Sequence, residues 1–157
     1  MTELSARLQS DLKDAMRSSD TTRRDVLRFL RSDIHNVEIE RGHPLSDDEI
    51  VDVVARQIKQ RRDAIEQFAH GGRQDLVDSE TAQIVILEDY LPPQLSAIEV
   101  LELAREVVAE SGGTGLSDLG RIIPVLRVRV GKRAPGNVVT QAARTALTEQ
   151  RDGANAR

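Results

Sequence analysis

Six basic residues near the end of the chain are the best candidates for chemistry, and the chemistry that suits them is phosphate binding. They are Arg121, Arg127, Arg129, Lys132, Arg133 and Arg144. Several cations on one surface bind a polyphosphate because each neutralised phosphate releases its counterions. The loop from Gly131 to Gly136 adds backbone N–H groups that can hold an anion. We take these six residues as a candidate nucleic-acid-binding set; the alternative is an ordinary solvated surface.

Spacing adds a further reason to expect an anion. Arg127, Arg129, Lys132 and Arg133 lie within seven positions of one another. Cations held so close are expected to repel one another, and a bound phosphate would relieve that repulsion. The three aromatic residues, Phe29, Phe68 and Tyr90, all precede this region. Contacts to the nucleic-acid backbone are therefore expected, without stacking on bases.

Other kinds of site find no support in the sequence. His35, His43 and His70 lack the spacing of metal ligands, and there is no cysteine. No pair of carboxylates stands out, and there is no nucleophile elbow. Walker and dinucleotide-binding glycine patterns are also missing. We expect no catalytic residue, no metal, no nucleotide and no other cofactor.

A second basic cluster, in the first half of the chain, has a structural interpretation. It consists of Arg56, Lys59, Arg61 and Arg62. Asp52, Asp63 and Glu66 lie three or four positions from members of this cluster. Residues at that spacing are neighbours on a helix and form ion pairs there. The sequence therefore predicts a salt-bridged outer face of a helix.

Composition sets the class of fold that must carry these side chains. Of the 157 residues, 39% are hydrophobic and only 2% aromatic, so the core is built from Leu, Ile, Val and Ala. Such a core suits helix-on-helix packing. The net charge of −4 is uneven, because residues 1–116 carry −9 and residues 117–157 carry +5. A basic end on an acidic body is suited to contact with a polyanion.

The spacing of apolar residues predicts an all-α fold with seven helices. Breaks between them are expected at Ser18–Asp20, Gly42–Pro44, Gly71–Gly72, Pro92–Pro93, Gly112–Gly113 and Lys132–Asn137. Ser46 with Glu49, and Ser96 with Glu99, have the spacing of capping boxes at helix starts. The sixth helix carries conflicting signals, because Pro124 interrupts it and residues 125–130 alternate as a strand does. Helix is favoured, since a lone strand has no partner.

Two prolines mark the expected domain boundary. Pro92 and Pro93 cannot continue a helix, and a capping box follows at once. We expect a helical bundle of about four helices over residues 1–92, a three-helix domain over 95–150, and a flexible tail over 151–157. The N-terminus lacks the apolar core of a signal peptide, and no apolar run is long enough to span a membrane. These features predict a cytoplasmic protein without a membrane partner; its oligomeric state is not determined by the sequence.

Several stretches together resemble one protein family. They are VLRFLRSDIHNVEIERG (26–42), LSDDEI (45–50), IKQRRDAIEQF (58–68), GRQDL (72–76), the run from Glu80 ending in YLPPQLS, and DLGRI (118–122). In this order and spacing they are similar to the YqeY family, the stand-alone relatives of the C-terminal tail of the GatB subunit of tRNA-dependent amidotransferase. The resemblance covers roughly residues 1–150. It implies a helical N-terminal domain joined to a three-helix tail domain. Pro124 departs from it, since a small residue is expected there.

The resemblance also implies a function. In GatB the tail domain contacts tRNA, and the amidation chemistry lies elsewhere in that complex. A description as a carbon–nitrogen ligase with glutamine as amide donor would thus reflect kinship, because no catalytic group is visible here. We expect a non-catalytic module that binds tRNA, or an assembly that processes tRNA, through the C-terminal domain. The alternative is a protein-interaction module that binds a partner helix without RNA.

Overall fold

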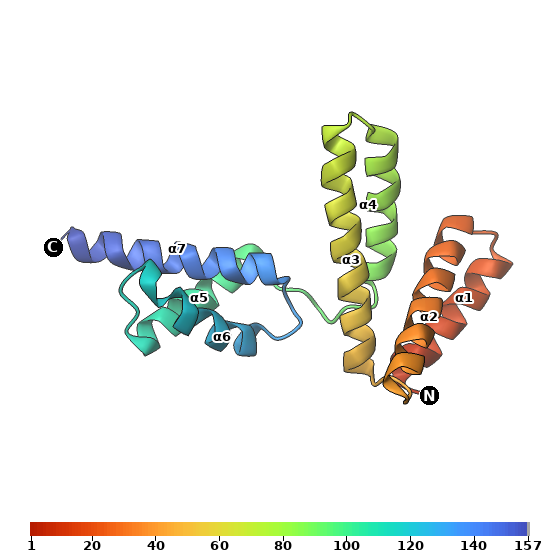
Figure 1. The fold of residues 1–157 in the computed structure, drawn as a ribbon, viewed down its shortest axis with the longest axis horizontal. Coiled ribbons are helices and arrows are strands. Elements are labelled where there is room, and N and C mark those ends of the chain that lie inside the picture. Colours follow the sequence, from red (N-terminus) through yellow and green to blue (C-terminus); the bar gives the residue numbers. More distant parts are fainter. Residues whose placement is uncertain (157) are drawn as a thin grey trace. The chain divides into compact units, whose positions relative to one another are not determined.

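The computed structural model describes residues 1–156, and within that range the chain forms seven α-helices, a short 3-10 helix and no strand (Figure 1). The helices are α1 (Glu3–Arg17), α2 (Thr21–Arg41), α3 (Asp47–His70), α4 (Gln74–Glu88), α5 (Ala97–Ser111), η1 (Leu116–Asp118), α6 (Leu119–Val130) and α7 (Gly136–Asn155). The predicted all-α fold is confirmed. Residues 125–130 are helical, as favoured over a strand.

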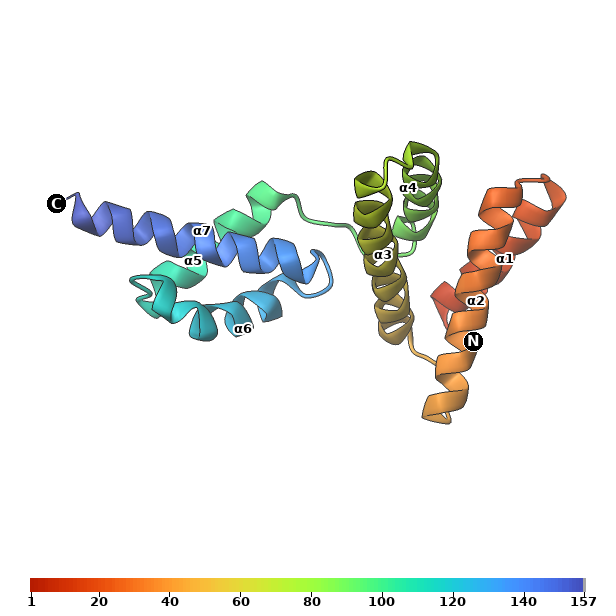
Figure 2. The same cartoon turned by 45° about the horizontal axis from the view of Figure 1, so that its top comes forward.

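The chain folds into two compact units, Met1–Leu91 and a second that begins at Pro92. In the first unit, α1 and α2 form one antiparallel hairpin and α3 and α4 form another (Figures 1 and 2). Its core is mostly aliphatic, with Leu27, Leu30, Val54 and Leu87 fully buried. Burying each such side chain contributes roughly 1.5–3 kcal/mol, which is what holds the two hairpins together.

The second unit has a separate core, between α5, α6 and α7. Figure 2 shows α7 running alongside both α5 and α6. Ala104 on α5 and Ala143 on α7 are fully buried, and their small side chains let these two helices approach closely. Leu126 and Leu147 fill the remaining space on α6 and α7. No residue of this core belongs to the core of the first unit.

A polar cluster surrounds the single tyrosine of the first unit. Tyr90 is 1% exposed and is the largest fully buried side chain. Its hydroxyl donates a hydrogen bond to Asp11 on α1, and the Arg7 guanidinium lies 4.9 Å from the centre of its ring. Arg7 and Arg23 are ion-paired with Asp11 at 3.7 and 3.8 Å. Because burial first and the Asp11 carboxylate second disfavour the phenolate, the pKa of Tyr90 is raised.

Both predicted capping boxes are present at the starts of α3 and α5. The Ser46 hydroxyl accepts from the Glu49 N–H, and the Ser46 N–H donates to the Glu49 carboxylate at 2.9 Å. Ser96 and Glu99 repeat this arrangement, with the return bond at 2.7 Å. These exchanges satisfy N–H groups that have no partner within the helix.

We expect these two glutamates to titrate below their ordinary pKa of 4.5, because the backbone N–H groups of Ser46 and Ser96 favour the charged forms. A pKa that is lower in the folded state stabilises the fold at pH values above the ordinary pKa. That stabilisation is lost as the pH falls through the lowered pKa. Carboxyl NMR titration checks this. The control is Glu49→Gln, in which the stability of α3 should lose the part of its acid dependence that comes from Glu49. A titration of either glutamate at or above 4.5 would contradict the assignment.

Two features of the second unit differ from the sequence-based expectation or refine it. Pro124 lies within α6 at an exposed position, and the residue four positions earlier is Gly120, in the first turn of the helix. The proline therefore removes a single helical hydrogen bond close to the start of the helix, and α6 continues to Val130. The flexible tail expected from residue 151 is helical as far as Asn155, because only Gly153 weakens the helix there and glycine costs only about 1 kcal/mol.

Candidate nucleic-acid interface

The fold places the cations of the candidate set around α6 and the loop that follows it. Ile122, Leu126 and Val130 recur every four residues on α6 and are fully buried. This stripe fixes the rotation of the helix against α5 and α7. Arg127 and Arg129 therefore lie on either side of the stripe and not on one face.

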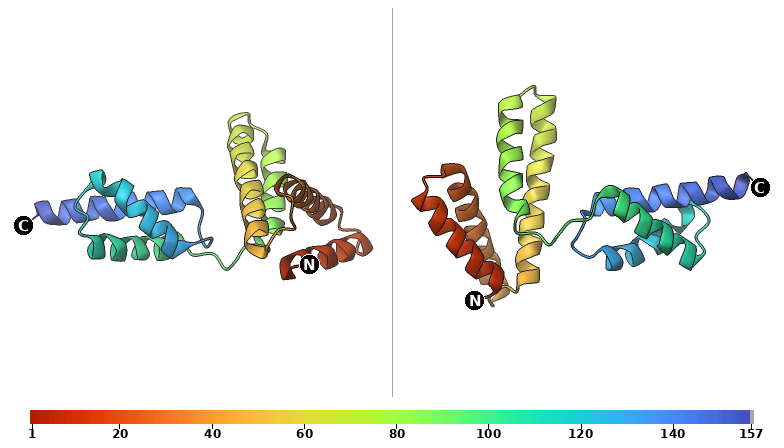
Figure 3. Two further views of the ribbon diagram at one scale, coloured as in Figure 1. Left: turned by 60° about the horizontal axis from the view of Figure 1, so that its bottom comes forward. Right: turned by 180° about the vertical axis from the view of Figure 1, so that it is seen from behind.

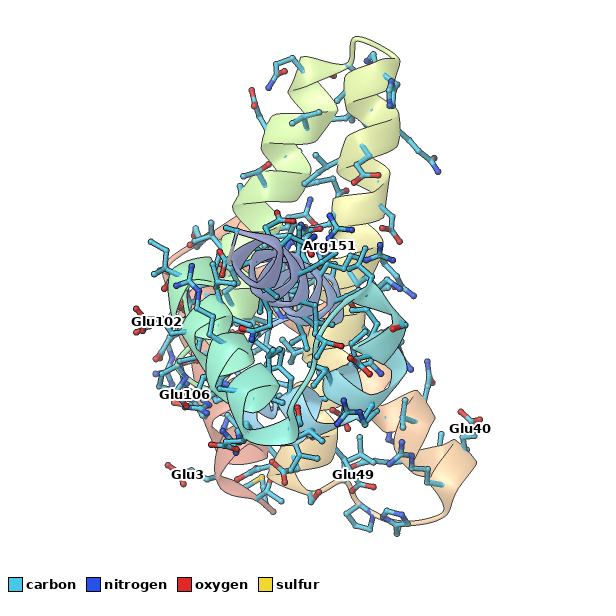
Figure 4. All side chains as sticks on the ribbon, turned by 90° about the vertical axis from the view of Figure 1, so that its left-hand side faces the viewer. Glu3, Glu40, Glu49, Glu102, Glu106 and Arg151 are labelled. Atoms are coloured by element: carbon cyan, nitrogen blue, oxygen red, sulfur yellow. The ribbon has the colours of Figure 1, made fainter. Side chains whose placement is uncertain are left out.

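Arg121 and Arg129 are bound within the unit. The Arg129 guanidinium donates a hydrogen bond to Glu110 and lies 3.8 Å from Glu106, both on α5. Figure 4 shows Glu106 projecting from α5. Arg121 donates to the Ser111 carbonyl at 2.5 Å and to Asp118 at 3.2 Å. The bonds to Glu110 and Ser111 join α6 to the end of α5, and the bond to Asp118 joins α6 to η1, so both arginines have a structural role.

The carboxylates around these two arginines remove the expected repulsion in part. Glu110 is the chief cause of a raised pKa for Arg129. Asp118, held first by the Thr114 N–H and then by Arg121, has a lowered pKa. The expectation that all the neighbouring cations repel one another is wrong for Arg129, because two acidic side chains of α5 lie beside it. Glu106 and Glu110 occupy successive turns of α5, but their contact with Arg129 depends on the packing of α5 against α6.

Arg133 caps the C-terminal end of α6. Its guanidinium donates to the carbonyls of Val130 at 3.2 Å and Arg129 at 2.8 Å. A cation in this position satisfies carbonyls that have no helical partner and interacts favourably with the helix dipole. The neighbouring Lys132 is exposed, and its backbone carbonyl accepts from Gln94 at 3.1 Å. The loop is thus an ordered part of the unit.

Arg127 on α6 and Arg144 on α7 are different. Both are exposed, and within residues 1–156 neither guanidinium has a hydrogen-bond or ion-pair partner. An exposed arginine guanidinium without a partner can bind a phosphate without first breaking a hydrogen bond or ion pair within the protein. Of the six candidate residues, these two are the best placed to bind an external anion.

Three arginines of the second basic cluster have partners on neighbouring helices. Arg56 pairs with Asp33 on α2 at 3.1 Å. Arg62 pairs with Glu88 on α4 at 3.4 Å. Arg61, the most buried of the cluster, pairs with Glu80 on α4 at 3.1 Å. These pairs link neighbouring helices of the first unit, a connection that spacing along one helix cannot reveal.

Comparison with known proteins places the chain in a family. The model of the family described as "Yqey-like protein" matches residues 5–147. This chain belongs to the YqeY family. The resemblance drawn from the sequence stretches is therefore confirmed, and it spans both units of this YqeY protein. In the part of the chain that the structure describes, no group of acidic, histidine or cysteine side chains is arranged to hold a metal.

Several curated relatives of this YqeY chain are named "Altered inheritance of mitochondria protein 41, mitochondrial". The protein from Lachancea thermotolerans is 40% identical over 87 residues, which cover 55% of this chain and 46% of the relative. The one from Eremothecium gossypii is 34% identical over 116 residues, covering 72% and 63%. The one from Pyrenophora tritici-repentis is 30% identical over 128 residues, covering 78% and 71%. The chain spans about half the length of the first of these relatives.

The cytoplasmic location predicted from the sequence is contradicted by these comparisons. The relatives are named as mitochondrial proteins. The prediction rested on the lack of an apolar signal-peptide core, which is a mark of secretion and does not separate the other compartments. Within residues 1–156, no helix has the length and apolar character needed to cross a membrane.

Proposed function

We propose that this YqeY protein is a non-catalytic module that binds tRNA, or an assembly that processes tRNA, through its C-terminal unit. The observation that carries the proposal is the pair of exposed guanidinium groups, those of Arg127 and Arg144, which have no partner within residues 1–156. The positive charge of residues 117–157 supports it, since that charge attracts a polyanion over a longer range. The resemblance to the C-terminal tail of GatB supports the choice of tRNA.

The mode of binding follows from which side chains the unit has. Every aromatic residue of the chain precedes Pro92, so the C-terminal unit has no ring on which a base can stack. Arginine forks bind phosphate through paired N–H groups. Contacts of this kind position the protein on an RNA and carry no sequence information. The protein is therefore expected to bind different tRNAs with similar affinity.

The test is the salt dependence of tRNA binding. We expect Arg127→Ala with Arg144→Ala to reduce the magnitude of the slope of log K against log salt by about 1.4–1.8, which is about 0.7–0.9 for each phosphate that is no longer neutralised. Filter binding at several salt concentrations, with two unrelated tRNAs, gives the slope. Both tRNAs should lose affinity alike.

The matched control is Arg105→Ala with Arg151→Ala. It removes the same charge from the same unit, but Arg105 is paired with Glu149 at 2.9 Å and Arg151 with Asp152 at 3.4 Å. This control should change the slope much less. Equal effects of the two double variants would mean that only net charge matters. No binding by the wild-type protein at low salt would reject the proposal.

One observation favours the alternative, a module that binds a partner helix. Val125 and Val128 lie one turn apart on α6, and they are 44% and 83% exposed. Apolar residues exposed at this spacing suit the groove-facing side of a helix pair. The protein-interaction function replaces the tRNA function if two results are obtained. The wild-type protein binds an identified partner protein and no tRNA, and Val128→Ser abolishes binding of that partner.

A further inference from the structure

The first unit contains a recess that has no part in the proposed function. It lies between α2, α3 and α4 and has a volume of about 540 Å³. In the right-hand view of Figure 3, the α1–α2 and α3–α4 hairpins diverge from the end at which α2 connects to α3. Val26 on α2 and Ala64 on α3 contribute apolar walls. Phe29, 58% exposed, stands at the edge.

A buried amide on the wall of this recess has one atom without a partner. Gln57 is 2% exposed, and its Nε2 donates to the Asp33 carboxylate at 3.0 Å. A carboxylate only accepts hydrogen bonds, so this bond fixes which end of the amide is nitrogen. Its Oε1 is buried and has no hydrogen-bond partner within residues 1–156. A buried acceptor left in this state costs free energy that a donor would recover.

A buried donor without a partner lies one helical turn away. The Arg61 guanidinium donates through Nη1 to Glu80 at 3.1 Å and to Gln83 at 2.5 Å. Its Nε–H is buried and has no acceptor among the described residues. Arg61 follows Gln57 by four positions on α3, and both line the recess. The wall of the recess therefore holds one acceptor and one donor without a partner, four residues apart on α3, and a ligand reaches these two buried atoms only when the side chains around them shift.

We propose that this recess binds a planar amide group, a carboxamide or a lactam. The N–H of the ligand donates to Gln57 Oε1, and its carbonyl accepts from Arg61 Nε–H. The apolar part of the ligand lies against Val26 and Ala64, with Phe29 covering its exposed side. Because the recess lies in the first unit, this proposal is independent of tRNA binding by the second unit.

The choice of an amide follows from the number and kind of the free groups. A carboxylate has no donor for Gln57, and an ammonium group has no acceptor for Arg61. The charge of Arg61 is already balanced by Glu80, so the site does not call for an ion. An amide edge carries one donor and one acceptor side by side and satisfies both groups at once. Water can also satisfy them, and it is the competing occupant.

Amide chemistry is tested with pairs of probes of similar shape, of which only one carries an N–H donor. Benzamide is compared with methyl benzoate, which lacks the N–H, and uracil with 1,3-dimethyluracil for the same reason. Nitrogen-15 NMR of the full chain follows the Gln57 and Arg61 side-chain signals during titration. We expect benzamide or uracil to give saturable shifts, and its donor-free partner to bind at least about tenfold more weakly. Which of the two binds better tells whether the source is a carboxamide or a nucleobase-like lactam.

Protein variants separate the polar groups from the apolar walls. Gln57→Met and Arg61→Lys should each weaken binding by about tenfold, and Arg61→Lys keeps the charge beside Glu80. Phe29→Ala, at an exposed position that leaves the core intact, should weaken binding several-fold. Its control is Ile39→Ala, on the same helix, 67% exposed and outside the recess, which should change nothing. Circular dichroism confirms that each variant is folded.

Two results would overturn the proposal. If methyl benzoate shifts the same signals as benzamide with equal affinity, the recess takes apolar rings and not amides. If no probe gives saturable shifts up to its limit of solubility, the two free groups are bound to water alone.

Discussion

Replacing Tyr90 by alanine is expected to lower the free energy of unfolding of the first unit by about 3–5 kcal/mol, while the second unit keeps its stability. Tyr90 is the largest fully buried side chain, and its removal leaves a cavity between α1 and the end of α4. The second unit has no residue in that core. We propose that the two units unfold independently, as a boundary at Pro92–Pro93 implies.

Amide hydrogen exchange measures the two units separately. Protection of the Val54 amide should fall by the full decrease in stability, and protection of the Leu126 amide should not change. The control is Tyr90→Phe, which keeps the ring and removes only the hydrogen bond to Asp11, at a cost of about 1.5–3 kcal/mol. Equal decreases of protection at Val54 and Leu126 would show that the units unfold together.

The same tyrosine makes the first unit sensitive to alkali. Its pKa is raised by burial and by Asp11, so it stays neutral in the folded state at a pH where an unfolded tyrosine ionises, near 10. A raised pKa of the folded state stabilises the fold below pH 10, and this stabilisation is lost as the pH rises further. In Tyr90→Phe the alkaline decrease in stability should be smaller.

The second large effect is expected in the other unit. Leu126→Ala should lower the stability of the C-terminal unit by about 2–5 kcal/mol, because this side chain is fully buried between α6 and its neighbours. Urea unfolding followed by circular dichroism should then show an early transition for this unit. The matched control is Val128→Ala on the same helix, which is 83% exposed and should change stability by less than about 0.5 kcal/mol. An early transition in the control, or none in Leu126→Ala, would contradict this account of the core.

Local signals in the sequence were sufficient to predict where most of the helices begin and end. Ser46 with Glu49 predicted the start of α3, and Gly71–Gly72 predicted its end, because caps and glycine turns act within a few residues. The interruption at Pro124 was harder to interpret, since its cost depends on how near it lies to the start of a helix. The sequence shows that a proline is present, but it does not show how many helical hydrogen bonds the proline removes.

The candidate sites depended on packing between helices, which spacing does not give. All six cations looked alike in the sequence, and only packing against α5 shows that Arg129 is bound to Glu110 while Arg127 has no such partner within residues 1–156. The recess shows the same limit. The sequence does not single out Gln57, because its unpaired oxygen becomes evident only when α2, α3 and α4 are brought together.

The way the C-terminal unit begins gives the loop after α6 a mechanical role. The Leu95 N–H donates to the Arg133 carbonyl at 2.7 Å, and the Gln94 side chain donates to the Lys132 carbonyl at 3.1 Å. Because residues 94 and 95 are bound to this loop, a ligand that makes the loop more rigid also restricts the chain that follows Pro92. By thermodynamic reciprocity, any ligand that stiffens this loop would bind more tightly when the chain after Pro92 is restrained. The chain that follows Pro92 and the loop that follows α6 are in this sense coupled through these two hydrogen bonds.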